Sequence, residues 1–191
     1  MLKKLIHLLR NPSSRYSLGL LLIIGAVGGI IFLLSFNWSV EMSSKEEFCT
    51  SCHEMSWVYE EYKDSVHYKN TSGVQATCSD CHVPKAWPAK MARKIKATLK
   101  EVPRTISGKI NTKEKFEAHR LELAESVWAV MKENDSLECR NCHVQEAMDL
   151  ASQDKSASKR HSMERRAEKG ETCIDCHKGI AHTLPGAHGE P

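Results

Sequence analysis

The sequence predicts a mainly helical protein in which a single N-terminal transmembrane helix is followed by one small domain with almost no sheet. Three observations lead to this prediction. Residues 17–36 carry no charged side chain, the pattern Cys-x-x-Cys-His occurs four times after them, and Phe, Trp and Tyr number only four each among 191 residues. A domain with so few large apolar side chains lacks ordinary core material for its length, so a bound group is expected to fill its interior.

The predicted transmembrane helix has the sequence SLGLLLIIGAVGGIIFLLSF, residues 17–36. At a rise of about 1.5 Å per residue, this segment crosses about 30 Å of hydrocarbon. The apolar run exceeds the core of about 7–15 residues in a secretory signal peptide, and no A-x-A cleavage site follows, so an uncleaved anchor is favoured. Gly25 and Gly29 have the spacing at which a second membrane helix can approach closely, which would allow a homodimer.

The charges beside this helix predict its orientation. No acidic residue precedes it, and the first charge after it is Glu41. Because positively charged flanks stay in the cytoplasm, residues 1–16 are expected to be cytoplasmic and the rest of the chain to lie on the opposite side. The basic residues before the helix are Lys3, Lys4, Arg10 and Arg15.

The composition argues against one class of function and indicates another. The formal net charge is only +3, and no basic stripe with interleaved aromatic residues is present, so nucleic-acid binding is not expected. The eight cysteines form four Cys-x-x-Cys pairs with none left over. Such regular pairing indicates a cofactor or metal framework.

A histidine directly follows the second cysteine of every pair. Two thiols three positions apart can bond to the two vinyl groups of a haem, and the adjacent histidine then lies under the iron as an axial ligand. Zinc sites do not need a histidine after every pair, and a thioredoxin-like site needs a single pair in a βαβ setting. The sequence therefore predicts four c-type haems. The motifs are Cys49-Thr-Ser-Cys52-His53, Cys78-Ser-Asp-Cys81-His82, Cys139-Arg-Asn-Cys142-His143 and Cys173-Ile-Asp-Cys176-His177.

The four motifs fall into two pairs, which predicts a duplicated two-haem unit. Haems 1 and 2 are expected within residues 49–82 and haems 3 and 4 within residues 139–182, with a helical linker over residues 86–134. His67 and His161 occupy similar places in the two halves. The expected fold is a small multihaem c-type cytochrome domain of helices and loops wrapped around porphyrin.

Six histidines lie outside the motifs, and three of them are predicted to be distal iron ligands. His67, His161 and His182 are these three, because each lies close in sequence to a motif. His7 precedes the transmembrane helix, and His188 lies in the C-terminal tail, residues 186–191, which is expected to be mobile. The sequence does not say which distal histidine serves which haem.

The sixth histidine, His119, has three alternative roles. The segment from Thr112 to Asn134 begins with a good N-cap residue and has apolar side chains at helical spacing, and His119 lies on that inward face. It could be a fourth distal ligand, a hydrogen-bonded core histidine or a proton acceptor. These alternatives stay open at the level of sequence.

The anchor and six further segments together resemble the NapC/NirT family of membrane-anchored tetrahaem cytochromes c over essentially the whole chain. The segments are EEFCTSCHEM, DSVHY, CSDCHVP, FEAHR, ECRNCH and TCIDCHKGIAH. The resemblance implies a protein of the bacterial inner membrane whose haem domain, residues 37–185, is periplasmic. It also implies oxidation of menaquinol or ubiquinol and electron delivery to a periplasmic reductase, with the nitrate reductase complex favoured over nitrite or other reductases by overall similarity.

The resemblance further implies a quinol site beside haem 1. In the relative that serves cytochrome c nitrite reductase, the methionine of a Cys-x-x-Cys-His-x-Met motif is the axial ligand in place of the histidine, which here would be Met55 in place of His53. A lysine and an acid that follow the second motif histidine complete that site, and the matching positions hold Lys94 and Glu101. Other members place the acid one residue earlier, where this chain has Lys100.

The chemistry of quinol oxidation agrees with this implied site. The reaction releases protons and electrons, so it needs a hydrogen-bond partner, a proton acceptor and a nearby haem edge. Lys94 and Glu101 are seven residues apart and are expected on one face of a helix, whose basic side chains would also suit contact with lipid headgroups. The alternative is a terminal reductase whose own open haem reduces a nitrogen oxide, and three predicted distal histidines argue against it.

Overall fold

The structure is a computed structural model that describes residue 3 and residues 15–186. His7, His188 and most of both predicted terminal segments lie outside the described residues. The chain divides into two compact units, Met1–Ser43 and Ser44–Pro191, and each is described separately. The described residues contain helices, turns and loops and no strand, as the sequence predicts.

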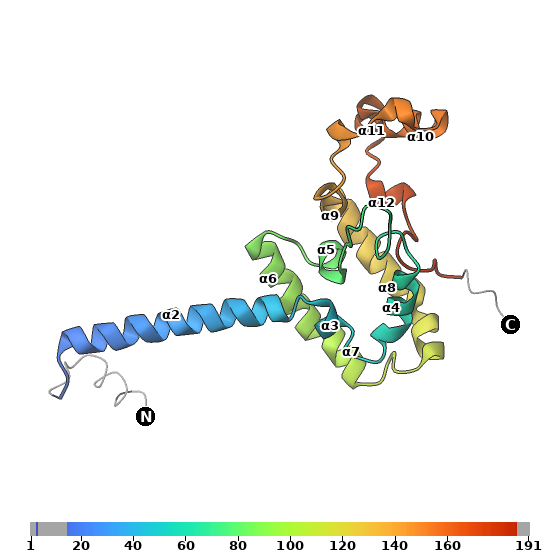
Figure 1. The fold of residues 1–191 in the computed structure, drawn as a ribbon. Helices are drawn as coiled ribbons and strands as arrows, with labels where there is room; N and C mark the ends of the chain where they lie inside the picture. Colours follow the sequence, from blue (N-terminus) through green and yellow to red (C-terminus); the bar gives the residue numbers. More distant parts are fainter. Residues whose placement is uncertain (1–2, 4–14, 187–191) are drawn as a thin grey trace. The chain divides into compact units, whose positions relative to one another are not determined.

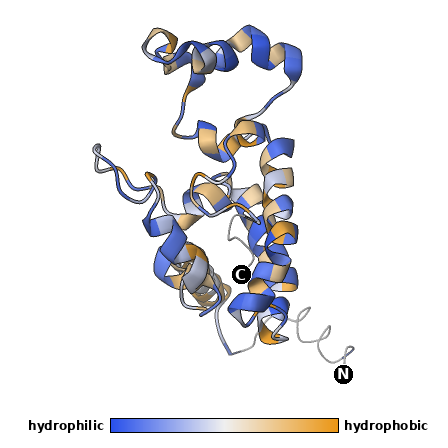
Figure 2. Cartoon of the chain, turned by 90° about the vertical axis from the view of Figure 1, so that its right-hand side faces the viewer, coloured by the Kyte–Doolittle hydropathy of each residue, from blue (hydrophilic) through white to orange (hydrophobic). Residues whose placement is uncertain are grey.

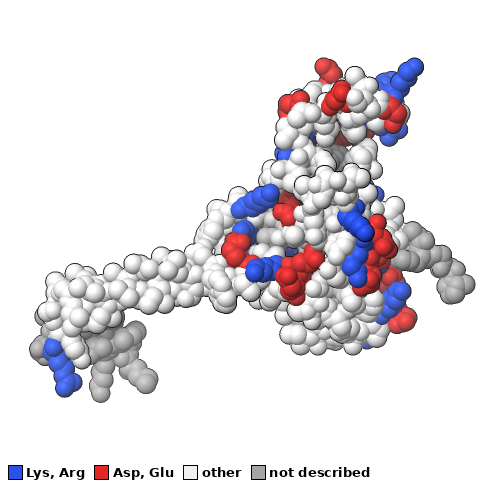
Figure 3. All heavy atoms as spheres, in the orientation of Figure 1, with Lys and Arg blue, Asp and Glu red and all other residues white. Residues whose placement is uncertain are grey.

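The first unit contains helix α2, Leu18–Met42, which is long and apolar enough to cross a membrane. Ser17 begins the helix, and its side chain accepts a hydrogen bond from the backbone N–H of Leu20 at 3.3 Å. Most of the large apolar side chains of α2 are exposed, and Figure 3 shows a surface free of charged groups along most of the helix. The helix extends beyond the predicted residue 36, because residues 37–42 still form helical hydrogen bonds.

The second unit is built from short helices joined by loops, with one long helix, α8, Lys113–Glu133 (Figure 1). The predicted linker over residues 86–134 is helical along most of its length but is interrupted by turns. The other helices are α3 (Glu46–Cys49), α4 (Met55–Lys63), α5 (Cys78–His82), α6 (Trp87–Lys96), the π-helix η1 (Ala97–Glu101), α7 (Val102–Ile106), α9 (Leu137–Arg140), the 3₁₀-helices η2 (Gln145–Ala147) and η3 (Leu150–Ser152), α10 (Lys155–His161), α11 (Met163–Lys169) and α12 (Cys173–Cys176).

The helices of the second and fourth motifs begin with the same cap. In α5, the backbone N–H of Thr77 donates to the Asp80 carboxylate at 2.9 Å. In α12, the backbone N–H of Thr172 donates to the Asp175 carboxylate at 2.8 Å. Each cap is a capping box, in which the threonine and the acid satisfy each other's free backbone groups. The shared pattern Thr-Cys-x-Asp-Cys-His therefore sets the start of both helices.

Ser136 joins the end of α8 to helix α12. Asp135 and Ser136 both have left-handed backbone angles, with φ of 56° and 50°, which non-glycine residues adopt at a cost. Ser136 is fully buried, and its hydroxyl accepts a hydrogen bond from the backbone N–H of Ile174 at 3.1 Å. This turn therefore fixes the third and fourth motifs relative to each other, since α9 follows it directly.

The second unit has almost no core of apolar side chains. Among its described residues, only Tyr62, Phe116 and Ile174 are buried hydrophobic residues. Larger apolar side chains such as Trp87 and Leu99 are exposed, and Figure 2 shows apolar residues spread over several helices. Three buried side chains cannot stabilise a unit of this size, so its interior is suited to a large bound group, as the low aromatic content predicts.

Candidate functional site

The structure places a motif histidine against a predicted distal histidine three times. The ring centres are 6.2 Å apart for His67 and His143, 6.2 Å for His82 and His182, and 5.9 Å for His161 and His177. When one metal ion lies between two imidazole nitrogens, two metal–nitrogen bonds of about 2 Å separate the rings. Adding the distance from each nitrogen to the centre of its own ring gives nearly the observed distance between ring centres. Each pair can therefore hold one metal ion between two ring nitrogens, which fits haem iron.

The three pairs connect parts of the chain that are far apart in sequence. His67 lies in the first half and faces the third motif, while His182, near the C-terminus, faces the second motif. His161 ends α10 and faces the fourth motif within its own half. His67 and His161 are thus equivalent in the sequence repeat but not in their partners. The repeat describes the motifs and their caps, while two of the three pairs join the halves.

Burial keeps the second pair of rings uncharged. Burial, with smaller effects from His182 and Arg93, lowers the pKa of His82 to about 4. Burial also lowers the pKa of His182. The neutral imidazole is the form that binds a metal ion, so both rings can act as ligands at neutral pH.

A buried charged cluster holds the segment that carries His182. Arg120 is only 5% exposed and donates hydrogen bonds to Glu61 at 2.6 Å and to Glu117 at 2.7 Å. Arg120 also donates to the carbonyl oxygen of Thr183, and the backbone N–H of Thr183 donates to Glu61, both at 3.0 Å. Helices α4 and α8 are therefore tied to the residue that follows His182. Burial would raise the pKa of Glu61, but the hydrogen bond from Arg120 contributes to a net lowering of that pKa.

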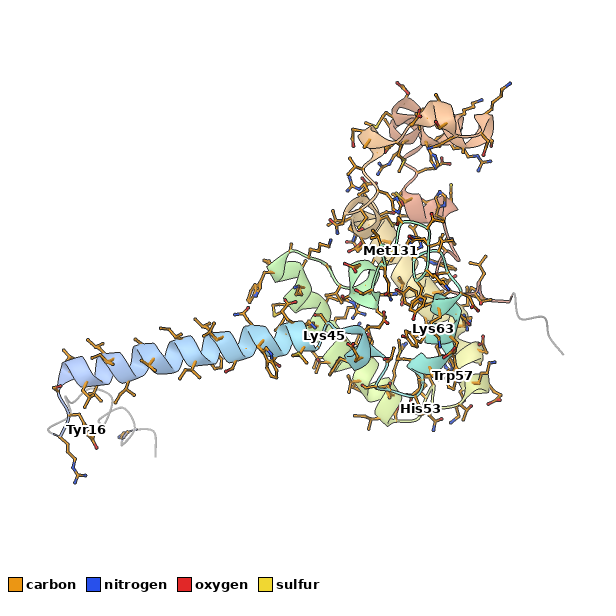
Figure 4. The ribbon with its side chains drawn as sticks, viewed as in Figure 1. Tyr16, Lys45, His53, Trp57, Lys63 and Met131 are labelled. Atoms are coloured by element: carbon orange, nitrogen blue, oxygen red, sulfur yellow. The ribbon has the colours of Figure 1, made fainter. Side chains whose placement is uncertain are left out.

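The first motif differs from the other three. Nε2 of His53 lies 2.9 Å from the carbonyl oxygen of Asn111, and Nδ1 lies 3.3 Å from the carboxylate of Glu54. The His53 side chain is 66% exposed and packs edge-on against Trp57 (Figure 4). Nε2 of His53 therefore lies against a carbonyl oxygen and not against a second imidazole ring. Met55, at the start of α4, is the nearby residue whose thioether sulfur could serve as a ligand instead.

His119 lies on α8 and belongs to none of the three ring pairs. Its Nδ1 is 2.8 Å from the carbonyl oxygen of Lys115, one turn earlier in the same helix. A hydrogen bond from Nδ1 leaves Nε2 able to bind a further partner. The three roles considered for His119 therefore stay predictions.

The segment that carries Lys94 and Glu101 is not a regular α-helix. Helix α6 continues into the π-helix η1, and Glu101 forms an ion pair with Arg93 at 2.8 Å. The wider π turn changes the helical period, so residues eight apart meet here. Pro103 is the one sequence signal for this turn, because it has no N–H to donate to the preceding turn.

Lys94 and Arg93 lie near the first two motifs. Arg93 donates a hydrogen bond from Nε to the carbonyl oxygen of His82 at 3.2 Å. A hydrogen bond with Cys78 and, more weakly, the positive charges of Lys94 and Arg93 lower the pKa of the Cys49 thiol to about 7, although burial opposes this shift. Sequence reasoning did not identify Arg93, because the partner of Glu101 depends on the π turn.

These features define a class of protein. In the part of the chain that the structure describes, one apolar helix that could span a membrane precedes a helical unit with four haem-attachment motifs. This unit has three facing histidine pairs and almost no side-chain core. The class is that of membrane-anchored c-type cytochromes, which carry iron in covalently bound haem.

Comparison with known proteins identifies the family. Residues 11–187 match the NapC/NirT cytochrome c family, N-terminal region, and the chain belongs to this family. Cytochrome c-type protein NapC of Escherichia coli strain K12 is 55% identical over 186 residues, which cover 97% of this chain and 91% of that relative. Denitrification system component NirT of Stutzerimonas stutzeri is 54% identical over 182 residues, which cover 95% of this chain and 89% of that relative.

A longer relative also matches. Cytochrome c-type protein TorC of Escherichia coli strain K12 is 48% identical over 184 residues, which cover 96% of this chain but only 47% of that relative. No solved structure matches the chain. Family membership and the apolar helix together establish a membrane-anchored cytochrome with an electron-transfer role.

Proposed function

We propose that the protein oxidises menaquinol or ubiquinol beside its first motif and passes the electrons through four c-type haems to a periplasmic reductase, with nitrate reductase as the favoured partner. The observation that carries this proposal is the difference between the motifs. Three motif histidines face a second histidine, and His53 faces oxygen atoms instead. Three closed haems suit electron conduction, while one haem with a different environment suits reaction with a substrate.

Each haem would be held by its two motif cysteines and by ligands from this chain. His82 with His182 would serve haem 2, His143 with His67 haem 3, and His177 with His161 haem 4. Met55 would serve haem 1, since Nε2 of His53 lies against the carbonyl oxygen of Asn111. Bound haem supplies a one-electron couple whose potential depends on these ligands and on their hydrogen bonds.

The protein's own residues would bind the quinol and receive its protons. Lys94 can donate a hydrogen bond to a quinol oxygen, and Glu101 can accept a proton while Arg93 holds its carboxylate in place. The same segment exposes apolar side chains that suit a lipid surface, with Ile95 60% and Leu99 70% exposed. A quinol dissolved in the bilayer would be met by such a segment.

The relatives support the choice of partner. The matched proteins include NapC of several bacteria and a NirT described as a denitrification system component, which favours respiration of nitrogen oxides. Delivery to nitrite reductase or another periplasmic reductase is the alternative within the same class. A second alternative is that the protein itself reduces a nitrogen oxide. It is disfavoured because three of the motif histidines have a facing ring.

The full-length protein in lipid nanodiscs tests the proposal. Menaquinol should reduce the haems, followed by absorbance, and adding periplasmic nitrate reductase and nitrate should reoxidise them. Lys94→Gln should abolish reduction by menaquinol while dithionite still reduces all haems, whereas Lys100→Gln in the same segment should react normally. Equal rates for both variants would remove Lys94 from the site. Rapid turnover of nitrite or hydroxylamine with reduced viologen and no partner would contradict electron delivery.

The topology is part of the proposal. The basic residues before α2 and the absence of acidic ones favour a cytoplasmic N-terminus and a periplasmic second unit in the inner membrane. Protease added to spheroplasts should digest the second unit, and digestion only after lysis would contradict this orientation. Gly25 and Gly29 would allow a homodimer, and Gly25→Leu with Gly29→Leu should then shift the detergent-solubilised protein to the monomer.

A further inference from the structure

Gln153 makes a direct contact with the ring of His161. Oε1 of Gln153 lies 2.6 Å from Nδ1 of His161. Oε1 can only accept a hydrogen bond, so Nδ1 carries the proton and Nε2 of the neutral ring has the free lone pair. The same ring lies opposite that of His177, with 5.9 Å between the ring centres and an angle of 22° between the ring planes. The contact therefore fixes the tautomer in which Nε2 can bind a metal ion.

The local structure holds Gln153 between two capped turns. Asp149 accepts a hydrogen bond from Ala151 at the start of η3, and Asp154 accepts two at the start of α10. Gln153 lies between η3 and α10 and is half-buried. Its side chain is thus presented to His161, at the other end of α10, by two short segments that each have their own cap.

The backbone of His161 is held by a second, separate network. Nε2 of Gln145 donates to the His161 carbonyl oxygen at 2.9 Å. Arg166 donates to Gln145 and also to Asp135, and Asp135 pairs with Arg140 of the third motif at 3.3 Å. Gln145 thus fixes the main chain of His161, while Gln153 fixes the direction of its ring.

The equivalent histidine of the first half has no such acceptor. Nδ1 of His67 is buried and has no hydrogen-bond partner within the described part of the chain. A hydrogen bond from Nδ1 makes the opposite ring nitrogen a stronger donor to iron, which stabilises the oxidised state. The two distal rings should therefore tune their haems differently.

We propose that Gln153 is a positioning residue that orients His161 and lowers the reduction potential of the haem held by the fourth motif. This inference rests on the proposed ligation of that haem by His161 and His177. The Cys-x-x-Cys-His pattern does not predict this role for Gln153. Haem 4 would have a lower reduction potential than the same haem with a distal histidine whose Nδ1 has no hydrogen-bond acceptor.

Potentiometric titration of the full-length protein tests the inference, with absorbance and low-temperature electron paramagnetic resonance as readouts. Gln153→Leu removes the acceptor and should raise the potential of one haem, while Gln153→Glu provides a charged acceptor and should lower the potential of the same haem. Ser152→Ala alters the same turn through the contact between Ser152 and Asp149, without touching His161, and should leave all potentials unchanged. His161→Met identifies haem 4, because it should change the ligand signal of that haem.

The outcomes separate the two proposals. An unchanged spectrum in His161→Met would contradict the ligation itself. A changed spectrum in His161→Met with unchanged potentials in both Gln153 variants would contradict the role of Gln153 alone. Equal shifts in Ser152→Ala and Gln153→Leu would also overturn it, because the turn and not the hydrogen bond would then set the potential. If Gln153→Leu does not assemble with its haems, the direction of the shift in Gln153→Glu decides.

Discussion

The carbonyl oxygen of Asn111 lies 2.9 Å from Nε2 of His53. Asn111 directly precedes Thr112, the N-cap of α8. The start of α8 therefore lies against the first motif. The other three motif histidines face a second imidazole ring instead. All four motifs share the pattern Cys-x-x-Cys-His, and this contact distinguishes the first motif from the other three.

The contact predicts different results for substitutions at His53 and Met55. Met55→Ala should change the spectrum of one haem, because the proposed sulfur ligand is lost. His53→Ala should retain the axial ligation of all haems, since Nε2 of that ring lies against the carbonyl oxygen of Asn111. Magnetic circular dichroism in the near infrared detects methionine ligation and provides the measurement. Loss of one ligand signal in His53→Ala, with an unchanged spectrum in Met55→Ala, would assign haem 1 to His53.

The ion pair across the π turn predicts a role for Arg93 in quinol oxidation. Arg93→Gln should lower the rate by between about tenfold and about 100-fold, because Glu101 would no longer be held in position. The free energy of unfolding should fall by about 1–3 kcal/mol, since the partly exposed ion pair and the hydrogen bond to the carbonyl oxygen of His82 are both lost. Stopped-flow reduction by menaquinol measures the rate, and urea titration measures stability.

A neighbouring lysine provides the control for Arg93. Lys96→Gln removes a positive charge two residues past Lys94, and no ion pair with Glu101 is lost. It should therefore leave the rate of quinol oxidation close to that of the natural sequence. Matching losses in Arg93→Gln and Lys96→Gln would mean that general positive charge, and not the ion pair, supports the reaction.

The sequence predicted the parts of the site whose chemistry is local. A Cys-x-x-Cys-His motif requires only five adjacent residues, so the four motifs could be found without knowledge of the fold. The partner of His67 could not be predicted, because its contact with His143 depends on how distant loops pack. Arg120 was missed for the same reason, since its partners Glu61 and Thr183 come from two other segments.

The lowered pKa of Glu61 predicts a pH dependence of stability. A carboxylate whose pKa is lower in the folded state stabilises the fold above its unfolded pKa of about 4.3, and this contribution is lost as the pH falls through the folded pKa. Glu61→Gln should therefore lower the free energy of unfolding at neutral pH and flatten its dependence on pH in the acidic range. Urea titrations at several pH values measure both quantities.

An exposed glutamate provides the comparison for Glu61. Glu60 lies one residue earlier on the same helix and pairs with Lys63, and its side chain is 68% exposed. Glu60→Gln should change stability little at any pH, because an exposed pair is screened by water. If both variants show the same pH profile, the acid dependence arises from net charge and not from the contact between Glu61 and Arg120.

The turn at Ser136 predicts how substitutions there affect stability. Ser136→Ala leaves the backbone N–H of Ile174 without its acceptor in a buried place, which should cost about 1–3 kcal/mol of unfolding free energy. Ser136→Gly loses the same acceptor but relieves the left-handed backbone at φ 50°, which disfavours side chains by about 1–2 kcal/mol. The glycine variant should therefore be more stable than the alanine variant, as measured by urea titration of the haem-loaded protein. Equal stability of the two would mean that the hydrogen bond, and not backbone strain, dominates this turn, whereas an alanine variant as stable as the natural sequence would remove Ser136 as the link between the third and fourth motifs.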